Sequence, residues 1–187
     1  MKIVGVVGKI GSGKDTVVKH ISSECSMRIL SIGDIAREIA QNEGLPAKRE
    51  NLQKITEKYY AKFGKTYFIN ETVRRIKYLN DDKVAITGIR APIDVTTLRK
   101  HFHENLILIC VTANKKNRFQ RLLKRNEPRD PKTWREFLEQ DREEEKIFQL
   151  SKTCKLADYR ITNNETIEKL FQKVNRIIKA HFIHSAR

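Results

Sequence analysis

The chain has 187 residues, of which 39% are hydrophobic and 33% are charged. This length and balance are typical of a single folded domain with its own core, and they exclude an intrinsically disordered chain. No run approaches the ~20 apolar residues that a membrane-spanning helix needs, so we expect no membrane span. Glycines interrupt the N-terminal apolar run and no cleavage site follows it, so we expect no signal peptide.

The charge is strongly basic. The formal net charge is +15, from 38 basic and 23 acidic residues. Such an excess predicts a polyanionic partner, either the phosphates of a nucleotide or, as an alternative, RNA. The basic residues are spread along the chain, and no basic stretch alternates with aromatic residues. We therefore favour a small nucleotide over a nucleic acid.

The cysteines indicate a reducing environment. Cys25, Cys110 and Cys154 are scattered, odd in number and form no C-x-x-C pair. Disulfide frameworks belong mainly to secreted proteins, so this usage predicts a cytoplasmic location. The sequence does not choose between a monomer and a homodimer.

A glycine-rich turn near the N-terminus is the strongest motif. It follows a β-branched apolar run at residues 3–7 and precedes apolar residues at helical spacing. The spacing G-x-x-x-x-G-K, between a strand and a helix, is that of the phosphate-binding loop. Glycines let backbone N–H groups converge on an anion, and the helix N-terminus adds partial positive charge. The expected nucleotide-binding residues are Gly8, Lys9, Ile10, Gly11, Ser12, Gly13, Lys14, Asp15 and Thr16.

The rest of the chain alternates predicted strands with predicted helices. Apolar runs predict strands at 27–32, 83–87, 106–111 and 158–162. Apolar residues at helical spacing predict helices from Ile35 to Gly44, at 48–62, 66–79 and 114–125, and from Ile167 onward. Asp130 followed by Pro131 predicts the N-cap and first residue of a further helix. The alternation predicts a parallel three-layer α/β sheet.

Polar residues follow the predicted strands where ligands of such sheets bind, at the carboxyl ends. Asp34 follows the second strand, Arg90 the third, and Asn163 and Asn164 the fifth. Phosphoryl transfer needs positive charge around the migrating group and a positioned acceptor. These residues therefore indicate a site for phosphoryl transfer beside the phosphate-binding loop.

Three segments resemble nucleoside monophosphate kinases. Residues 33–37 resemble the G-D-x-x-R stretch that holds the acceptor nucleotide in those enzymes. Residues 87–92 resemble the D-G-x-x-R segment of adenylate kinases and, more closely, the I-x-x-x-R-x-P segment of deoxynucleoside monophosphate kinases, whose arginine contacts the acceptor phosphate. Residues 121–125 resemble the R-x-x-x-R entry to the lid of adenylate-kinase-like enzymes. The lid region, with the stretch ADYRITNNETIEKL, also resembles dephospho-CoA kinases and a group of little-characterised archaeal and bacterial kinase-like proteins. The likeness to that group runs over nearly the whole chain and includes the P-x-T-W-x-x-F segment at 131–137.

The resemblance implies a three-layer α/β/α P-loop NTPase fold whose five-stranded parallel sheet has the order 2-3-1-4-5. It implies a core at residues 1–33, 81–125 and 146–187, a helical acceptor-binding insertion at 34–80 and a lid at 126–145. The implied cofactors are ATP and Mg²⁺. The implied catalytic residues are Lys14, Asp34, Arg90, Arg125 and Arg129. The residues implied to bind the acceptor are Asp34, Arg37 and Arg90. The residues implied to bind the nucleotide, besides those of the phosphate-binding loop, are Arg121, Arg125, Asn163 and Asn164.

One position departs from the usual phosphate-binding loop. A serine or threonine that binds magnesium normally follows the lysine, but Asp15 stands there and Thr16 comes one residue later. Thr87 ends the third strand, where an acid is usual. The two residue types look exchanged, so Asp15 and Thr87 are candidate Mg²⁺ ligands. The alternative is that Thr16 supplies the hydroxyl and Asp34 holds magnesium through water.

Three functions stay open from the sequence. The first is transfer of the γ-phosphoryl group of Mg-ATP to a nucleoside or deoxynucleoside monophosphate. The second is a dephospho-CoA kinase, in which Asp34 would be the base for a ribose hydroxyl. The third is a regulatory P-loop ATPase that binds RNA or protein through its basic surface.

Overall fold

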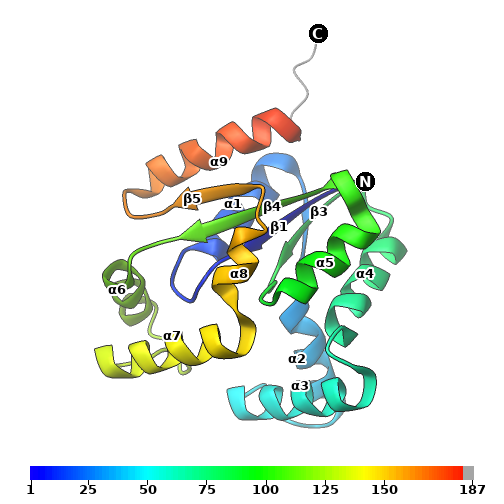
Figure 1. Cartoon of the computed structure of the whole chain (residues 1–187), viewed down its shortest axis with the longest axis vertical. Coiled ribbons are helices and arrows are strands. Elements are labelled where there is room, and N and C mark those ends of the chain that lie inside the picture. The colour runs from blue at the N-terminus through cyan, green and yellow to red at the C-terminus, as the bar shows by residue number, and fades with distance from the viewer. Residues whose placement is uncertain (183–187) are drawn as a thin grey trace.

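A computed structural model describes residues 1–182, apart from the side chain of Arg49, and its centre is a five-stranded sheet. The strands are β1 (Lys2–Val7), β2 (Arg28–Ser31), β3 (Lys83–Thr87), β4 (Leu106–Thr112) and β5 (Tyr159–Thr162). They lie in the order β2-β3-β1-β4-β5, and all neighbouring pairs are parallel. The expected strand order and fold class are therefore confirmed (Figure 1).

Helices connect the strands. They are α1 (Lys14–Cys25), α2 (Ile32–Asn42), α3 (Arg49–Phe63), α4 (Tyr67–Leu79), α5 (Pro92–Phe102), α6 (Lys115–Arg125), α7 (Trp134–Phe148), α8 (Leu150–Lys155) and α9 (Ile167–His181), with a 3₁₀ turn at His103–Asn105. The sequence pattern predicts neither α5 nor α8, and the 6 residues of α8 are too few to show an apolar period. Along residues 1–182, no helix is both long and apolar enough to cross a bilayer.

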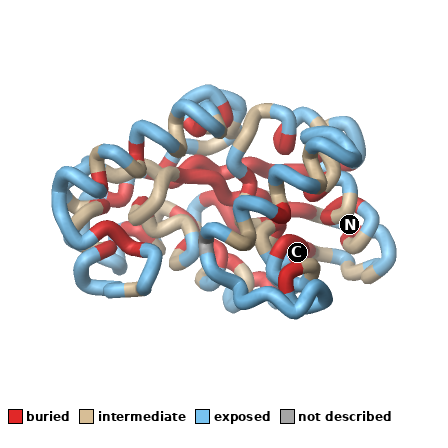
Figure 2. The backbone as a smooth tube through the Cα atoms, turned by 90° about the horizontal axis from the view of Figure 1, so that it is seen from below, coloured by how far each residue is buried: buried red, intermediate tan, exposed pale blue. Residues whose placement is uncertain are grey.

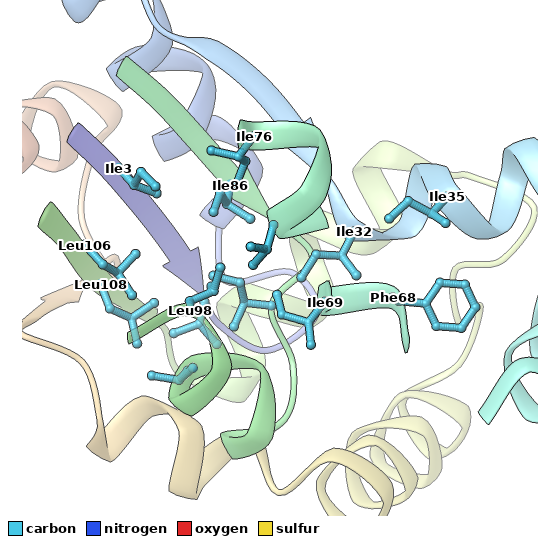
Figure 3. Close-up of a cluster of buried hydrophobic side chains, with 14 of the residues drawn as sticks. Ile3, Ile32, Ile35, Phe68, Ile69, Ile76, Ile86, Leu98, Leu106 and Leu108 are labelled. Atoms are coloured by element: carbon cyan, nitrogen blue, oxygen red, sulfur yellow. The ribbon is translucent and has the colours of Figure 1, made fainter. Parts of the chain in front are cut away.

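Alternate strand residues point to opposite faces of the sheet, and this alternation builds two cores. Ile3 faces the core formed with α2, α4 and α5, whereas Val4 faces the core formed with α1 and α9. Figure 3 shows Ile69 and Ile76 of α4 in the first core, and Figure 2 shows buried backbone running through the centre of the molecule. The segment expected as an insertion thus shares the core of the sheet. Of the core range expected at 146–187, residues 183–187 lie outside the described part.

The start of α7 differs from the sequence-based expectation. The helix begins at Trp134, and its N-cap is Thr133, whose hydroxyl accepts a hydrogen bond from the N–H of Glu136 at 3.2 Å. The prediction that Asp130 caps this helix, with Pro131 as its first residue, is wrong. Asp130 is buried, and its carboxylate accepts hydrogen bonds from the guanidinium of Arg125 and from the N–H of Glu127.

Two of the cysteines also differ from expectation. Cys110 of β4 and Cys154 of α8 form a disulfide across a sequence separation of 44 residues, while Cys25 is free and buried. Sequence spacing carries no signal for such a pair, because the fold and not the local motif brings the two thiols together. The interpretation of the cysteines as marks of a reducing environment therefore does not hold for this pair.

Candidate active site

The turn between β1 and α1 is a backbone cradle that requires glycine. Gly11 and Gly13 have φ angles of 73° and 93°, in the left-handed region that other residues rarely adopt. A Cβ on Gly8 would lie 2.4 Å from the carbonyl oxygen of Val111. The hydroxyl of Ser12 is buried in the turn and has no hydrogen-bond partner among residues 1–182. A phosphate chain would fit this cradle and would give the hydroxyl an acceptor.

Lys14 opens α1 and lies half-buried at the centre of the site. Burial lowers the pKa of its ammonium; the charges of Asp15 and Glu144 oppose that shift, and those of Arg90 and Arg125 add to it. Arg90 follows β3 and Arg125 ends α6, so two arginines that are far apart in the sequence act on the charge of one lysine. A cluster of cations of this kind suits a polyphosphate.

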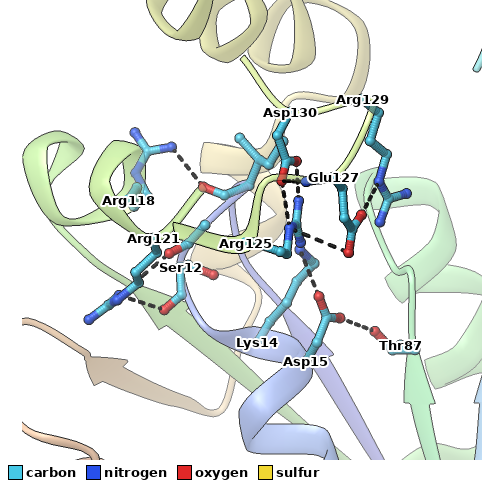
Figure 4. Close-up of polar contacts among 12 residues, drawn as sticks. Ser12, Lys14, Asp15, Thr87, Arg118, Arg121, Arg125, Glu127, Arg129 and Asp130 are labelled. Carbon is cyan, nitrogen blue, oxygen red and sulfur yellow. Dashed lines mark hydrogen bonds and ion pairs between the residues drawn. The ribbon is translucent and has the colours of Figure 1, made fainter. Parts of the chain in front are cut away.

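Asp15 and Thr87 meet beside this lysine (Figure 4). The hydroxyl of Thr87 donates to Oδ1 of Asp15 at 3.3 Å, and Oδ2 of Asp15 lies 3.9 Å from Nζ of Lys14. A carboxylate and a hydroxyl are oxygen ligands of the kind that Mg²⁺ prefers, so this donor set fits the metal. Within the described residues, no group of three or more His, Cys, Asp or Glu side chains could hold a metal. The other ligands would therefore be water and nucleotide oxygens.

Arg90 is held through its backbone on both sides. Its N–H donates to Oδ2 of Asp94 at 3.0 Å, and its carbonyl accepts the hydroxyl of Thr153 at 2.8 Å. Its guanidinium lies 5.0 Å from the ring centre of Phe148. Within residues 1–182, no carboxylate forms an ion pair with Arg90. The arginine is thus fixed at its base and exposed at its tip, as an anion ligand should be.

The other residues expected at the acceptor site pair with each other. The guanidinium of Arg37 donates to Oδ1 of Asp34 in the first turn of α2. Both side chains are exposed, at 43% and 56% respectively, so the pair is open to exchange with a ligand. Thr16, the alternative hydroxyl ligand for magnesium, is half-buried in α1.

Arg125 at the end of α6 and Arg129 in the expected lid are both paired with carboxylates of the segment between α6 and α7. Nε of Arg125 donates to Asp130 at 2.9 Å, with a second hydrogen bond from the same guanidinium, and Nε of Arg129 donates to Glu127 at 2.9 Å. The hydrogen bonds from Arg125 hold the pKa of Asp130 below its ordinary value. Figure 4 shows this cluster directly above Lys14.

Arg121 and Asn163 hold the backbone of the phosphate-binding loop. The guanidinium of Arg121 donates to the carbonyl of Asn163 at 2.9 Å and approaches the carbonyl of Ser12 at 3.4 Å. The amide of Asn163 donates to that same Ser12 carbonyl at 2.8 Å. Asn164 instead accepts from the N–H of Asn114 at 2.8 Å. We expected Arg121 and Asn163 to contact the nucleotide. In the structure both side chains support the backbone of the loop that would bind it.

No sequence motif predicts one buried ion pair that lies beside the site. Arg118 of α6 and Asp141 of α7 are 3% and 4% exposed and form two hydrogen bonds, of 2.7 and 3.0 Å. Arg118 also donates to the carbonyl of Ile10 at 3.2 Å, and Lys9 lies 3.0 Å from Glu145. These contacts tie α7 to the phosphate-binding loop. The only signal in the sequence is an arginine within a basic helix, which does not distinguish a buried from a solvated side chain.

Comparisons with known proteins agree with the fold. Residues 4–149 match the AAA domain family AAA_18. The chain is 33% identical over 179 residues to the UPF0200 protein of Pyrococcus horikoshii, covering 94% of this chain and 95% of that protein. Among solved structures, it is similar to a shikimate kinase from Acinetobacter baumannii in complex with shikimate, with TM-score 0.60, 19% identity and coverage of 98% and 96%. It is also similar to a gluconokinase from Sinorhizobium meliloti 1021, with TM-score 0.61, 13% identity and coverage of 96% and 94%.

Proposed function

Since the chain belongs to the UPF0200 family and carries the AAA domain of P-loop kinases, we propose that it transfers the γ-phosphoryl group of Mg-ATP to a nucleoside or deoxynucleoside monophosphate. The observation that carries the acceptor class is Arg90. It is a cation without a carboxylate partner in residues 1–182, held at the end of β3 and close enough to lower the pKa of Lys14. A guanidinium in this position would hold the phosphate of an acceptor in a bidentate manner.

The contacts support one role for each residue in this proposal. Lys14 and the loop N–H groups bind the β- and γ-phosphates of ATP. Arg90 holds the acceptor phosphate, and Arg37 joins it by exchanging Asp34 for that phosphate. Arg125 dissociates from Asp130 and neutralises charge on the transferring phosphoryl group as the lid closes.

Magnesium belongs to the proposal as the nucleotide's partner. When bound, it supplies charge neutralisation across the β- and γ-phosphate oxygens. Asp15 and Thr87 would hold it, directly or through water. Arg121 and Asn163 would keep the loop backbone in place while the nucleotide binds.

We place this chemistry in the cytoplasm. The disulfide does not exclude that location, because intracellular proteins of some hyperthermophiles contain disulfides.

The experiment is a panel of acceptors scored by ADP release in the presence of Mg-ATP. It contains nucleoside and deoxynucleoside monophosphates, dephospho-CoA, and shikimate and gluconate, after the two kinases of similar fold. Turnover with a nucleotide acceptor alone supports the proposal. Turnover only with dephospho-CoA, shikimate or gluconate would overturn the acceptor class but keep the kinase. ATP hydrolysis that RNA stimulates and no small molecule affects would identify a regulatory ATPase instead.

A further inference from the structure

We propose that Thr153 of α8 positions Arg90, and that the Cys110–Cys154 disulfide holds α8 in place, so that acceptor binding depends on the redox state of this pair. The inference rests on the proposed function in one respect, since it takes Arg90 as the ligand of the acceptor's phosphate.

The disulfide joins α8 to the strand beside the phosphate-binding loop. Cys110 is fully buried in β4, where it is paired in register with Val7, the last residue of β1. Cys154 lies in α8 and is half-buried. The covalent ring that they close contains α6, the expected lid and α7. The cross-link therefore fixes the point at which the chain returns from the lid to the sheet.

The residue next to Cys154 touches the acceptor arginine. Thr153 is fully buried, and its hydroxyl donates to the carbonyl of Arg90 at 2.8 Å, a contact between residues 63 apart in the sequence. Phe148, at the end of α7, lies under the guanidinium of the same arginine. Two of the contacts that hold Arg90 thus come from one short arm, which consists of the end of α7 and α8. The third comes from Asp94 on α5.

This arm depends on its attachments. A helix of 6 residues is not stable by itself, so α8 keeps its place through side-chain packing and the cross-link. Leu150, which is 3% exposed, is its apolar anchor at one end, and Cys154 is the covalent anchor at the other. A dithiol such as dithiothreitol would give the disulfide two electrons and two protons, producing two thiols while the dithiol becomes a cyclic disulfide. Cys154 would then be free to leave β4, and Thr153 with it.

The first test concerns Thr153 alone. Thr153→Val removes the hydroxyl at nearly constant volume, and Thr153→Ser retains it. We measure hydrogen exchange of the backbone at residues 88–94 in the full chain without ligand, and binding of AMP as the acceptor probe with the P-loop filled by ADP. Thr153→Val should speed the exchange and weaken AMP binding, each on the order of tenfold, because the part-buried carbonyl of Arg90 loses its hydrogen-bond donor. Thr153→Ser should restore both values, and ADP affinity should stay within about twofold.

The second test concerns the disulfide. Thiol titration of the unfolded chain should find one free thiol before reduction and three after it, from the single disulfide and Cys25. Reduction by dithiothreitol, or Cys154→Ser, should change exchange at 88–94 and AMP affinity in the same direction as Thr153→Val. Cys25→Ala, which alters a buried cysteine in the opposite core, is the control and should change neither.

The outcomes separate this inference from the proposed function. Three free thiols before reduction, or exchange at 88–94 that is the same in oxidised, reduced and Thr153→Val protein, would overturn the inference. If AMP and the other nucleotides of the panel fail to bind the oxidised protein, the proposed acceptor class is wrong, and the exchange measurement still decides whether α8 positions Arg90.

Discussion

The hydroxyl of Thr87 donates a hydrogen bond of 3.3 Å to the carboxylate of Asp15, so the last residue of β3 meets the residue that follows the phosphate-binding lysine. In most P-loop proteins a hydroxyl follows the lysine and an acid supplies the other magnesium ligand. Here the two residue types are exchanged between the two positions. A carboxylate so near the β-phosphate would repel it unless a cation lay between them. We therefore predict that Asp15 and Thr87 together hold the magnesium ion.

A double-mutant cycle checks this prediction. Asp15→Ser and Thr87→Asp should each weaken the binding of Mn²⁺, used as a probe in the presence of ADP, and the double variant should recover most of the loss. Electron paramagnetic resonance of free Mn²⁺ measures this binding without any turnover. A double variant no better than the sum of the two single losses would contradict the exchange. If Thr16→Ala and Asp34→Asn weaken Mn²⁺ binding while Asp15→Ser does not, the alternative ligand set is correct.

The second prediction concerns Lys14. Its ammonium should stabilise charge on the transferring phosphoryl group, so Lys14→Ala should lower kcat by a factor on the order of 10² or more, since removing one preorganised donor costs ~3 kcal/mol. Lys19→Ala, an exposed lysine on the same helix, is the matched control. Steady-state ADP release measures both. Near-normal turnover by Lys14→Ala would rule out the kinase proposal.

The third prediction separates the two acceptor arginines. Arg90→Ala should raise the KM of the acceptor by at least about tenfold and leave the KM of ATP nearly unchanged, because a phosphate ligand is lost on one side of the cleft only. Arg37→Ala should act in the same direction but more weakly, since Asp34 already neutralises this arginine. Arg90→Lys keeps the charge without the planar fork and should lie between wild type and Arg90→Ala. A rise in the KM of ATP alone would place these residues on the wrong side of the cleft.

Local patterns suffice to predict most of the fold. The strand predicted at 83–87 has the bounds Lys83–Thr87 in the structure, and the phosphate-binding loop joins the predicted strand and helix. These elements are predictable because apolar periodicity and glycine positions act over a few residues. The N-terminus of α7 is not predictable in this way. Asp130 is of a residue type that commonly caps helices, but its carboxylate is bound by Arg125 instead. Tertiary contact overrides local propensity there.

The site is predictable in its residue types and not in its pairings. Lys14, Arg90 and Arg125 stand out as cations after strands and helices, where such sheets bind ligands. Their partners do not stand out, since a hydrogen bond such as that from Thr153 to Arg90 joins residues 63 apart. The same limit applies to the Cys110–Cys154 disulfide. Sequence spacing along a chain says little about separation across a sheet.

The buried Arg118–Asp141 pair shows how burial and a partner charge together set the pKa of a carboxyl group. Burial raises the pKa of Asp141, but the hydrogen bonds and charge of Arg118 outweigh burial and leave that pKa below its ordinary value. A carboxyl with a depressed pKa in the folded state stabilises the fold fully at pH values above its unfolded pKa of about 3.9. That contribution is lost as the pH falls below this value and through the lower pKa of the folded state.

The last prediction follows from this sign. At neutral pH, Asp141→Asn should lower the free energy of unfolding by about 3–5 kcal/mol, because it leaves the guanidinium of Arg118 buried without a counter-charge. The double variant Arg118→Met, Asp141→Leu should lose much less, since both charges are gone. The difference between wild type and Asp141→Asn, measured by urea unfolding, should stay constant above about pH 5 and shrink below about pH 4. Glu139→Gln, from the exposed pair with Arg135 on the same helix, is the control and should change the stability little at any pH. If the difference between wild type and Asp141→Asn shrinks between pH 6 and 8 instead, a group other than this carboxylate governs the stability of the α6–α7 contact.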